Sequence, residues 1–228
     1  VAATVTAAAA AVAGSADEAI ILSNGSSQTA DTTATYNGLE VINFSAAGTT
    51  GLKSATVDNS LTLASTALEK VVVTGNAAVN LTVSLAGASL DTQTSEFDAS
   101  AAGGVITAHV TKGASVNATV TMSAQGDFLD YNGAVASTAT LDGGDGADTL
   151  SVTASITGGN TLGTGVTTSG IETLNVNAVT TTTVDSTLMA GVTTLVNNGS
   201  LGNLTVTGLG SIPTVSLTGT SSDTTLGY

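Results

Sequence analysis

Short alternating runs of Val, Leu, Ile and Thr recur along this sequence, and they constrain its fold more than any other feature. Clusters of Gly, Asn, Asp and Ser separate the runs, which is the pattern of half-buried β-strands joined by turns. Helical periodicity is confined to the Ala-rich start and to residues 65–69. The chain is therefore predicted to be all-β, with strands that include residues 39–44, 70–73, 81–85, 174–176, 204–206 and 214–217.

The interior of this β-structure must be built in thin layers, because large side chains are scarce. Hydrophobic residues make up 42% of the 228 residues, but aromatic residues only 3%. A parallel β-solenoid stacks thin coils that Val, Leu, Ile and Ala can fill, whereas immunoglobulin-like sandwiches need a larger core centred on aromatic residues. We therefore predict a parallel β-solenoid of the β-roll or β-helix kind with short irregular insertions. Tandem β-sandwich modules are the alternative.

Two parts of the chain resemble each other. Residues 39–44 (LEVINF) resemble residues 171–176 (IETLNV), and further matching segments follow in the same order. Such self-similarity indicates repeated structural units. We expect an Ala-rich N-terminal segment over 1–13, a first β repeat unit over 14–142 and a second, related unit over 143–228, together forming one continuous solenoid.

The charge balance and the missing residue types exclude several classes of function. Three Lys+Arg against 17 Asp+Glu give a net charge of −14, which disfavours nucleic acid and anionic membranes as partners. No apolar run reaches the roughly 18 residues of a membrane helix. Cys and Arg are absent, and His109 is the one histidine, so most active sites cannot be assembled. We expect a protein that is not an enzyme, with His109 on an outward strand position and calcium as the natural counter-ion.

One segment carries specific metal chemistry. Residues 141–150 read LDGGDGADTL and contain the GGxGxDxL pattern of calcium-binding β-rolls. Glycines permit the left-handed backbone that turns carbonyl oxygens inward, Asp148 supplies a carboxylate, and Leu150 enters the interior as the next strand starts. Calcium takes six to eight oxygen ligands, which is more than one turn supplies.

A second turn, 18 residues upstream, is predicted to complete the site. Coils of that length align Asp148 with Asp130 and Asp145 with Asp127. Asp148 and Asp130 are then side-chain ligands on opposite turns, while Asp127, Asp142 and Asp145 contribute carbonyl oxygens or negative field. The alternative is a solvated acidic turn, since Asp and Gly are the usual turn residues. The expected calcium-binding residues are Gly126, Asp127, Asp130, Gly143, Gly144, Asp145, Gly146 and Asp148.

The segments GGDGADTL (143–150), SGIETLNV (169–176) and LEKVVVTGNAAVNLTV (68–83), together with FDAS (97–100), resemble the RTX-type surface-layer proteins of Gram-negative bacteria. The resemblance implies secretion, calcium-triggered folding outside the cell, and assembly with copies of the same chain into a layer on cell-surface polysaccharide. The nonapeptides are fewer here than in a tandem array. Because the chain does not start with Met, we expect a fragment or a processed part of a longer protein.

The expected function is that of a structural extracellular protein that self-assembles into a calcium-stabilised surface layer or filament. A calcium-dependent adhesin or matrix-binding module is the alternative, because such modules also use repetitive β-architecture and calcium. A polysaccharide-acting enzyme ranks third, since the Arg base typical of a β-helical lyase is missing. The three lysines are too scattered for a basic patch and are expected to solubilise the chain or pair with nearby acids.

Overall fold

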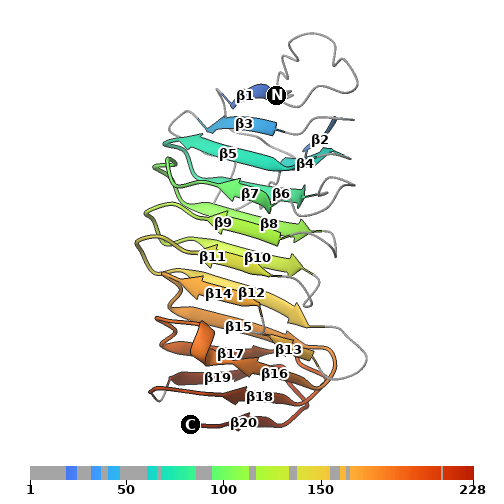
Figure 1. Cartoon of the computed structure of the whole chain (residues 1–228), viewed down its shortest axis with the longest axis vertical. Coiled ribbons are helices and arrows are strands. Elements are labelled where there is room, and N and C mark those ends of the chain that lie inside the picture. The colour runs from blue at the N-terminus through green and yellow to red at the C-terminus, as the bar shows by residue number, and fades with distance from the viewer. Residues whose placement is uncertain are drawn as a thin grey trace.

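The structure of this chain is a computed structural model. Every strand pair that it describes is parallel, and the strands stack coil upon coil along the long axis of the molecule (Figure 1). The predicted parallel β-solenoid is confirmed. Tandem sandwiches are excluded for this part of the chain, since their sheets are antiparallel. The described residues are 19–24, 32–36, 41–46, 61–65, 68–85, 94–112, 117–133, 138–154, 160–162, 165–211 and 213–228.

Three parallel sheets form the walls of the described solenoid. The first sheet contains β1 (Ala19–Asn24), β3 (Val41–Ala46), β5 (Lys70–Gly75), β7 (Thr94–Asp98), β9 (Asn117–Thr121), β11 (Ala139–Asp142) and β14 (Val166–Ser169). The second sheet contains β2 (Thr32–Tyr36), β4 (Leu61–Ser65), β6 (Val79–Leu85), β8 (Ile106–Lys112), β10 (Phe128–Gly133), β12 (Thr149–Ala154), β15 (Thr173–Ala178), β17 (Thr194–Asn198) and β19 (Thr214–Thr218). The third sheet contains β13 (Asn160–Leu162), β16 (Thr182–Asp185), β18 (Leu204–Thr207) and β20 (Thr224–Leu226).

The core consists of columns of side chains that stack from coil to coil. In the second sheet, Leu129, Leu150, Leu174 and Leu195 occupy one column, and each is at most 2% exposed. Burying each such leucine stabilises the fold by about 2 kcal/mol. In strands such as β3 and β15 every second residue is buried, which is the alternation that the sequence predicts. The predicted strand at 214–217 departs from this pattern, since all five residues of β19 are exposed.

The first sheet does not run the full length of the described solenoid, and the third sheet forms a wall of the C-terminal coils. The first sheet ends at β14, and the third sheet begins at β13. Beyond β14, the first sheet continues only as an isolated bridge between Thr168 and Met189. The short 3-10 helix η1 (Ser186–Leu188) precedes this bridge. The C-terminal coils are therefore built mainly from the second and third sheets.

The spatial repeat is the single coil. The expected boundary between residues 142 and 143 falls in the turn after β11, and β10 pairs directly with β12 across it. The two similar segments lie on different walls, since β3 belongs to the first sheet and β15 to the second. The second sheet thus runs through both expected units, whereas the Ala-rich segment 1–13 lies outside the described residues.

Candidate metal centre

Two of the predicted acidic turns stack directly on each other between the first and second sheets. The turn at 143–148 lies over the turn at 122–127, and glycines make the close approach possible. A Cβ on Gly144 would lie 2.1 Å from the carbonyl oxygen of Ser123, and Gly144 has φ +87°. Gly146 is equally constrained, with φ +132° and 2.4 Å to a main-chain oxygen. Only glycine fits these two positions.

The register of the coils differs from the expected 18 residues. Leu129 pairs with Leu150 and Asp130 pairs with Ser151, so these two coils are 21 residues apart. The amide of Thr149 donates to the carbonyl oxygen of Asp127 at 3.0 Å, which extends the same register into the turn. The prediction that Asp148 faces Asp130 is therefore wrong, because each coil carries more residues than the compact β-roll coil on which the alignment was based.

Asp130 lies on the outer face of the second sheet. Its Oδ2 atom is 3.1 Å from Nδ1 of His109 on the neighbouring strand β8, and both side chains are about one third exposed, at 32% and 37%. The ring of Phe128 lies beside the imidazole, with 6.2 Å between ring centroids. His109 is thus on an outward strand position, as expected, and Asp130 is removed from the turn.

A ladder of carboxylates connects successive coils at the start of the second-sheet strands. Oδ1 of Asp127 accepts the amide of Ile106 at 2.7 Å, Oδ1 of Asp148 accepts the amide of Asp127 at 2.7 Å, and Oε2 of Glu172 accepts the amide of Asp148 at 2.8 Å. Each carboxylate therefore satisfies a main-chain donor of the preceding coil. Glu172 was missed by the sequence analysis, although all three acids directly precede a strand.

Asp127 is fully engaged by the protein itself. Its second oxygen, Oδ2, accepts the amide of Ser123 at 2.7 Å and the hydroxyl of the same residue at 2.8 Å, and the residue is 4% exposed. Burial raises the pKa of this carboxyl group, while the hydrogen bonds from Ile106 and Ser123 oppose that rise. Asp127 therefore holds the turn in shape and has little capacity left for a metal ion.

Asp148 is engaged on one side only. The residue is 1% exposed, and its Oδ2 atom is buried without a hydrogen-bond partner. Burial, together with the nearby charges of Asp127, Glu172 and Asp142, raises the pKa of this carboxyl group to about 6, although the hydrogen bond from the Asp127 amide opposes the rise. The two ion pairs of the described residues, Lys70–Glu96 and His109–Asp130, lie elsewhere. Among the described residues, no ion pair therefore balances the charge of Asp148, whose Oδ1 accepts the Asp127 amide.

The other predicted residues, apart from Asp130, lie in the same two stacked turns. Gly143 is buried beside it, since a Cβ there would lie 2.9 Å from Cβ of Asp148. Gly126 lies against Ala147, since a Cβ on Gly126 would lie 3.3 Å from the carbonyl oxygen of Ala147. Asp145 is exposed at the tip of the turn, and Oδ1 of Asp142 accepts the amide of Gly144 at 3.2 Å.

The stacked turns present one buried carboxylate oxygen without a hydrogen-bond partner, Oδ2 of Asp148. An unpartnered buried oxygen among several acidic groups is a feature that a bound cation explains. No group of three His, Cys, Asp or Glu side chains within the described ranges could hold a metal ion. A calcium ion at Asp148 would therefore draw most of its six to eight oxygens from main-chain carbonyls and water.

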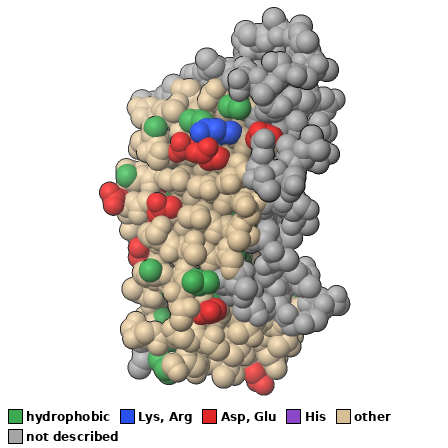
Figure 2. Space-filling model, viewed as in Figure 1, with side chains coloured by type: hydrophobic (Ala, Val, Ile, Leu, Met, Phe, Trp, Pro, Cys, Tyr) green, Lys and Arg blue, Asp and Glu red, His purple; other side chains and the backbone are tan. Residues whose placement is uncertain are grey.

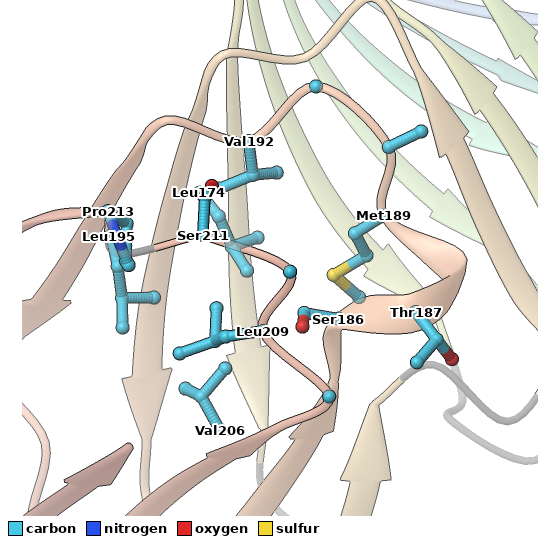
Figure 3. A pocket seen from close by; sticks show the side chains of 14 residues that line it. Leu174, Ser186, Thr187, Met189, Val192, Leu195, Val206, Leu209, Ser211 and Pro213 are labelled. Atoms are coloured by element: carbon cyan, nitrogen blue, oxygen red, sulfur yellow. The ribbon is translucent and has the colours of Figure 1, made fainter. Parts of the chain in front are cut away.

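A separate cavity of about 320 Å³ lies in the C-terminal coils, where the first sheet has ended. Figure 3 shows Met189, Val192 and Leu209 around it. None of its lining residues is charged. Its lining includes none of the carboxylates of the candidate metal centre.

Comparisons with known proteins do not assign the chain to a family. No protein-family model, no curated protein and no solved structure matches it. Within the described residues, the structure has no helix that is long and apolar enough to cross a membrane.

Proposed function

We propose that this chain is a structural extracellular protein of the RTX surface-layer type, which assembles with copies of itself into a calcium-stabilised layer or filament. The observation that carries the proposal is the buried, unpartnered Oδ2 of Asp148 in a stacked glycine-rich turn. An ion at this point neutralises charge that the folded chain otherwise has to bury. Secretion and contact with cell-surface polysaccharide are parts of the same proposal.

The solenoid supports a structural role through its construction. Main-chain hydrogen bonds connect every described coil to the next, and the core columns run through both halves of the chain. Such a stack gains stability from contacts between neighbouring coils. A rigid and repetitive rod of this kind suits a layer or filament in which many weak contacts between copies add up.

Calcium in this proposal acts through Asp148, with Asp142 and Glu172 contributing negative field. The ion supplies positive charge and oxygen coordination to the turn. Because Asp127 already uses both carboxylate oxygens, the protein provides few charged ligands. Sites with few charged ligands bind calcium weakly, in the 10⁻⁴–10⁻³ M range of extracellular modules, which agrees with a location outside the cell.

Electron microscopy of negatively stained protein tests the proposal. Purified chain should form ordered sheets or filaments in millimolar calcium and should lose them when a chelator is added. Asp148→Asn should assemble poorly in calcium. Asp130→Asn removes a carboxylate that lies beside His109 and outside the turn, so this variant should assemble like the natural sequence. Separate single particles under both conditions would overturn the proposed function.

A further inference from the structure

The residue that directly precedes each second-sheet strand changes in character along the solenoid. Asp127, Asp148 and Glu172 precede β10, β12 and β15. Thr193 and Pro213 hold the same place before β17 and β19. On the face shown in Figure 2, uncharged side chains and backbone also form most of the surface of the C-terminal coils. The carboxylates that connect the middle coils therefore end at Glu172.

The cavity of about 320 Å³ lies beside the uncharged turns of these C-terminal coils. Two segments border it, residues 186–192 after β16 and residues 208–211 after β18 (Figure 3). Leu174, Leu195 and Val206 line it from the second and third sheets, and each of the three is 2% exposed. The cavity is thus a concave site against the apolar core.

Main-chain contacts fix both bordering segments. The amide of Met189 donates to the carbonyl oxygen of Ser186 at 3.0 Å, and Met189 also forms the isolated bridge with Thr168. The amide of Leu209 donates to the carbonyl oxygen of Gly227 at 3.2 Å. The cavity is therefore formed by ordered backbone, as sites for small molecules usually are before their ligand binds.

The lining determines the class of molecule that fits. None of its described residues is charged, so an ionic ligand would lose its hydration without compensation. Oγ of Ser186 already donates to the carbonyl oxygen of Thr207 at 2.8 Å, and Oγ1 of Thr187 donates to Oδ1 of Asp185 at 2.6 Å. The thioether of Met189 makes favourable contacts with aromatic rings. The site therefore suits a neutral, apolar and aromatic molecule.

The volume sets the size of that molecule. The cavity lies near the lower end of the roughly 300–1,000 Å³ that sites for small molecules span, and a cavity of roughly 150 Å³ holds one benzene ring. We infer that this cavity binds a neutral, mainly apolar small molecule of the size of two fused aromatic rings. This binding goes beyond the proposed calcium-dependent assembly and does not depend on it.

Nuclear magnetic resonance of the full chain, labelled at its methionine methyl groups, tests the inference with indole as the probe. The chain contains two methionines. Met189 lines the cavity, whereas Met122 is buried in the acidic turn at 122–127 and is the internal control. Indole should shift the Met189 signal until it saturates and should leave the Met122 signal in place. The variant Met189→Leu assigns the signals.

A charged probe and a matched pair of variants sharpen the test. Indole-3-acetate carries the same rings with a carboxylate and should bind at least about tenfold more weakly than indole. Leu209→Asn places an amide in the lining at a partly buried position and should weaken indole binding to a similar extent. Leu201→Asn makes the same change at a side chain that is 72% exposed and outside the lining, so it should bind indole as the natural sequence does.

Several results would overturn the inference. A Met189 signal that does not move at any concentration of dissolved indole, or that moves together with the Met122 signal, excludes binding in the cavity. Equal binding of indole and indole-3-acetate contradicts the assigned class of ligand. Equal binding by Leu209→Asn and Leu201→Asn contradicts the assigned lining, and if Leu209→Asn does not fold, the two probes on the natural sequence decide. None of these results bears on the proposed function, which electron microscopy tests separately.

Discussion

The middle turns and the C-terminal turns use different side chains to satisfy main-chain donors of the preceding coil. In the middle, Asp148 and Glu172 accept amides of the preceding coil through carboxylate oxygens. In the C-terminal coils a hydroxyl is the acceptor, since Oγ of Ser200 accepts the amide of Ala178 at 2.8 Å. Both solutions keep the coils in register, since a buried amide without a partner is costly.

The two solutions have different consequences. Carboxylates form stronger hydrogen bonds than hydroxyls, but stacking them brings negative charges together, and at Asp148 one oxygen is left buried and unpartnered. Hydroxyls leave the C-terminal turns neutral. The comparison shows that buried negative charge accumulates in the middle turns and is avoided in the C-terminal turns.

The largest expected effect comes from filling the close contact between the acidic turns. Gly144→Ala combines a positive φ with a Cβ that would lie 2.1 Å from the oxygen of Ser123, so we expect a loss of about 3 kcal/mol or more. Gly210→Ala is the matched control, because nothing lies within 4 Å of its Cβ position. Thermal unfolding measures both. Equal melting temperatures would show that the turns do not pack as described.

The second prediction concerns the pH dependence of the calcium-free protein. The folded-state pKa of Asp148 is raised from 3.8 to about 6, so the folded state binds more protons than the unfolded state between these values. The contribution of this group to stability is therefore present below pH 4 and is lost, by about 3 kcal/mol, as the pH rises through 6.

Asp148→Asn checks this origin of the pH dependence. The amide keeps an acceptor for Asp127 and removes the buried charge, so in chelator at neutral pH the variant should melt above the natural sequence. Its melting temperature should also change less between pH 4 and pH 7. A natural sequence whose stability in chelator rises over this interval, with the variant behaving identically, would contradict the assignment.

A smaller effect is expected in the hydroxyl-connected turns. Ser200→Ala removes the acceptor of the Ala178 amide at a fully buried position, which should cost about 1–2 kcal/mol, or a few degrees in melting temperature. The loss should be the same with calcium and with chelator. Ser221→Ala, at an exposed position in the next turn, serves as the control. A calcium-dependent loss in Ser200→Ala would remove the distinction between the two kinds of turn.

The smallest effect is expected outside both kinds of turn. Lys70 and Glu96 pair at 2.7 Å on the outer face of the first sheet, with both side chains more than one third exposed. Such surface pairs contribute little, so Lys70→Met should change the free energy of unfolding by about 0.5 kcal/mol or less. Chemical denaturation resolves a change of that size. A loss comparable to that of Ser200→Ala would mean that surface charge pairs, and not the turns, hold neighbouring coils together.

The sequence predicts the solenoid because alternation and side-chain size are local properties. The alternation predicts the strand at 174–176 and an inward Leu150, and the scarcity of aromatic residues argues against sandwiches. The strands that carry Leu129 and Leu195 are not among those predicted. The lengths of the coils do not follow from local patterns, because each turn adds its own number of residues. The 18-residue spacing therefore placed Asp148 beside the wrong acid.

A signal for the true register is nevertheless present in the sequence. Asp127, Asp148 and Glu172 each directly precede a run of alternating residues, and aligning these three acids gives the observed stacking. No comparable signal in the sequence marks the point after β14 where the first sheet ends and the third sheet takes its place. The Thr-rich strands of the third sheet resemble those of the first, and only the long-range pairing distinguishes them.

Calorimetric titration of calcium into the natural sequence, Asp148→Asn and Asp130→Asn tests the central claim most directly. The account predicts that Asp148→Asn weakens calcium binding by at least about tenfold, whereas Asp130→Asn, whose carboxylate lies beside His109, binds almost as the natural sequence does. Equal small losses in both variants, or the larger loss in Asp130→Asn, would contradict a calcium site at the stacked turns.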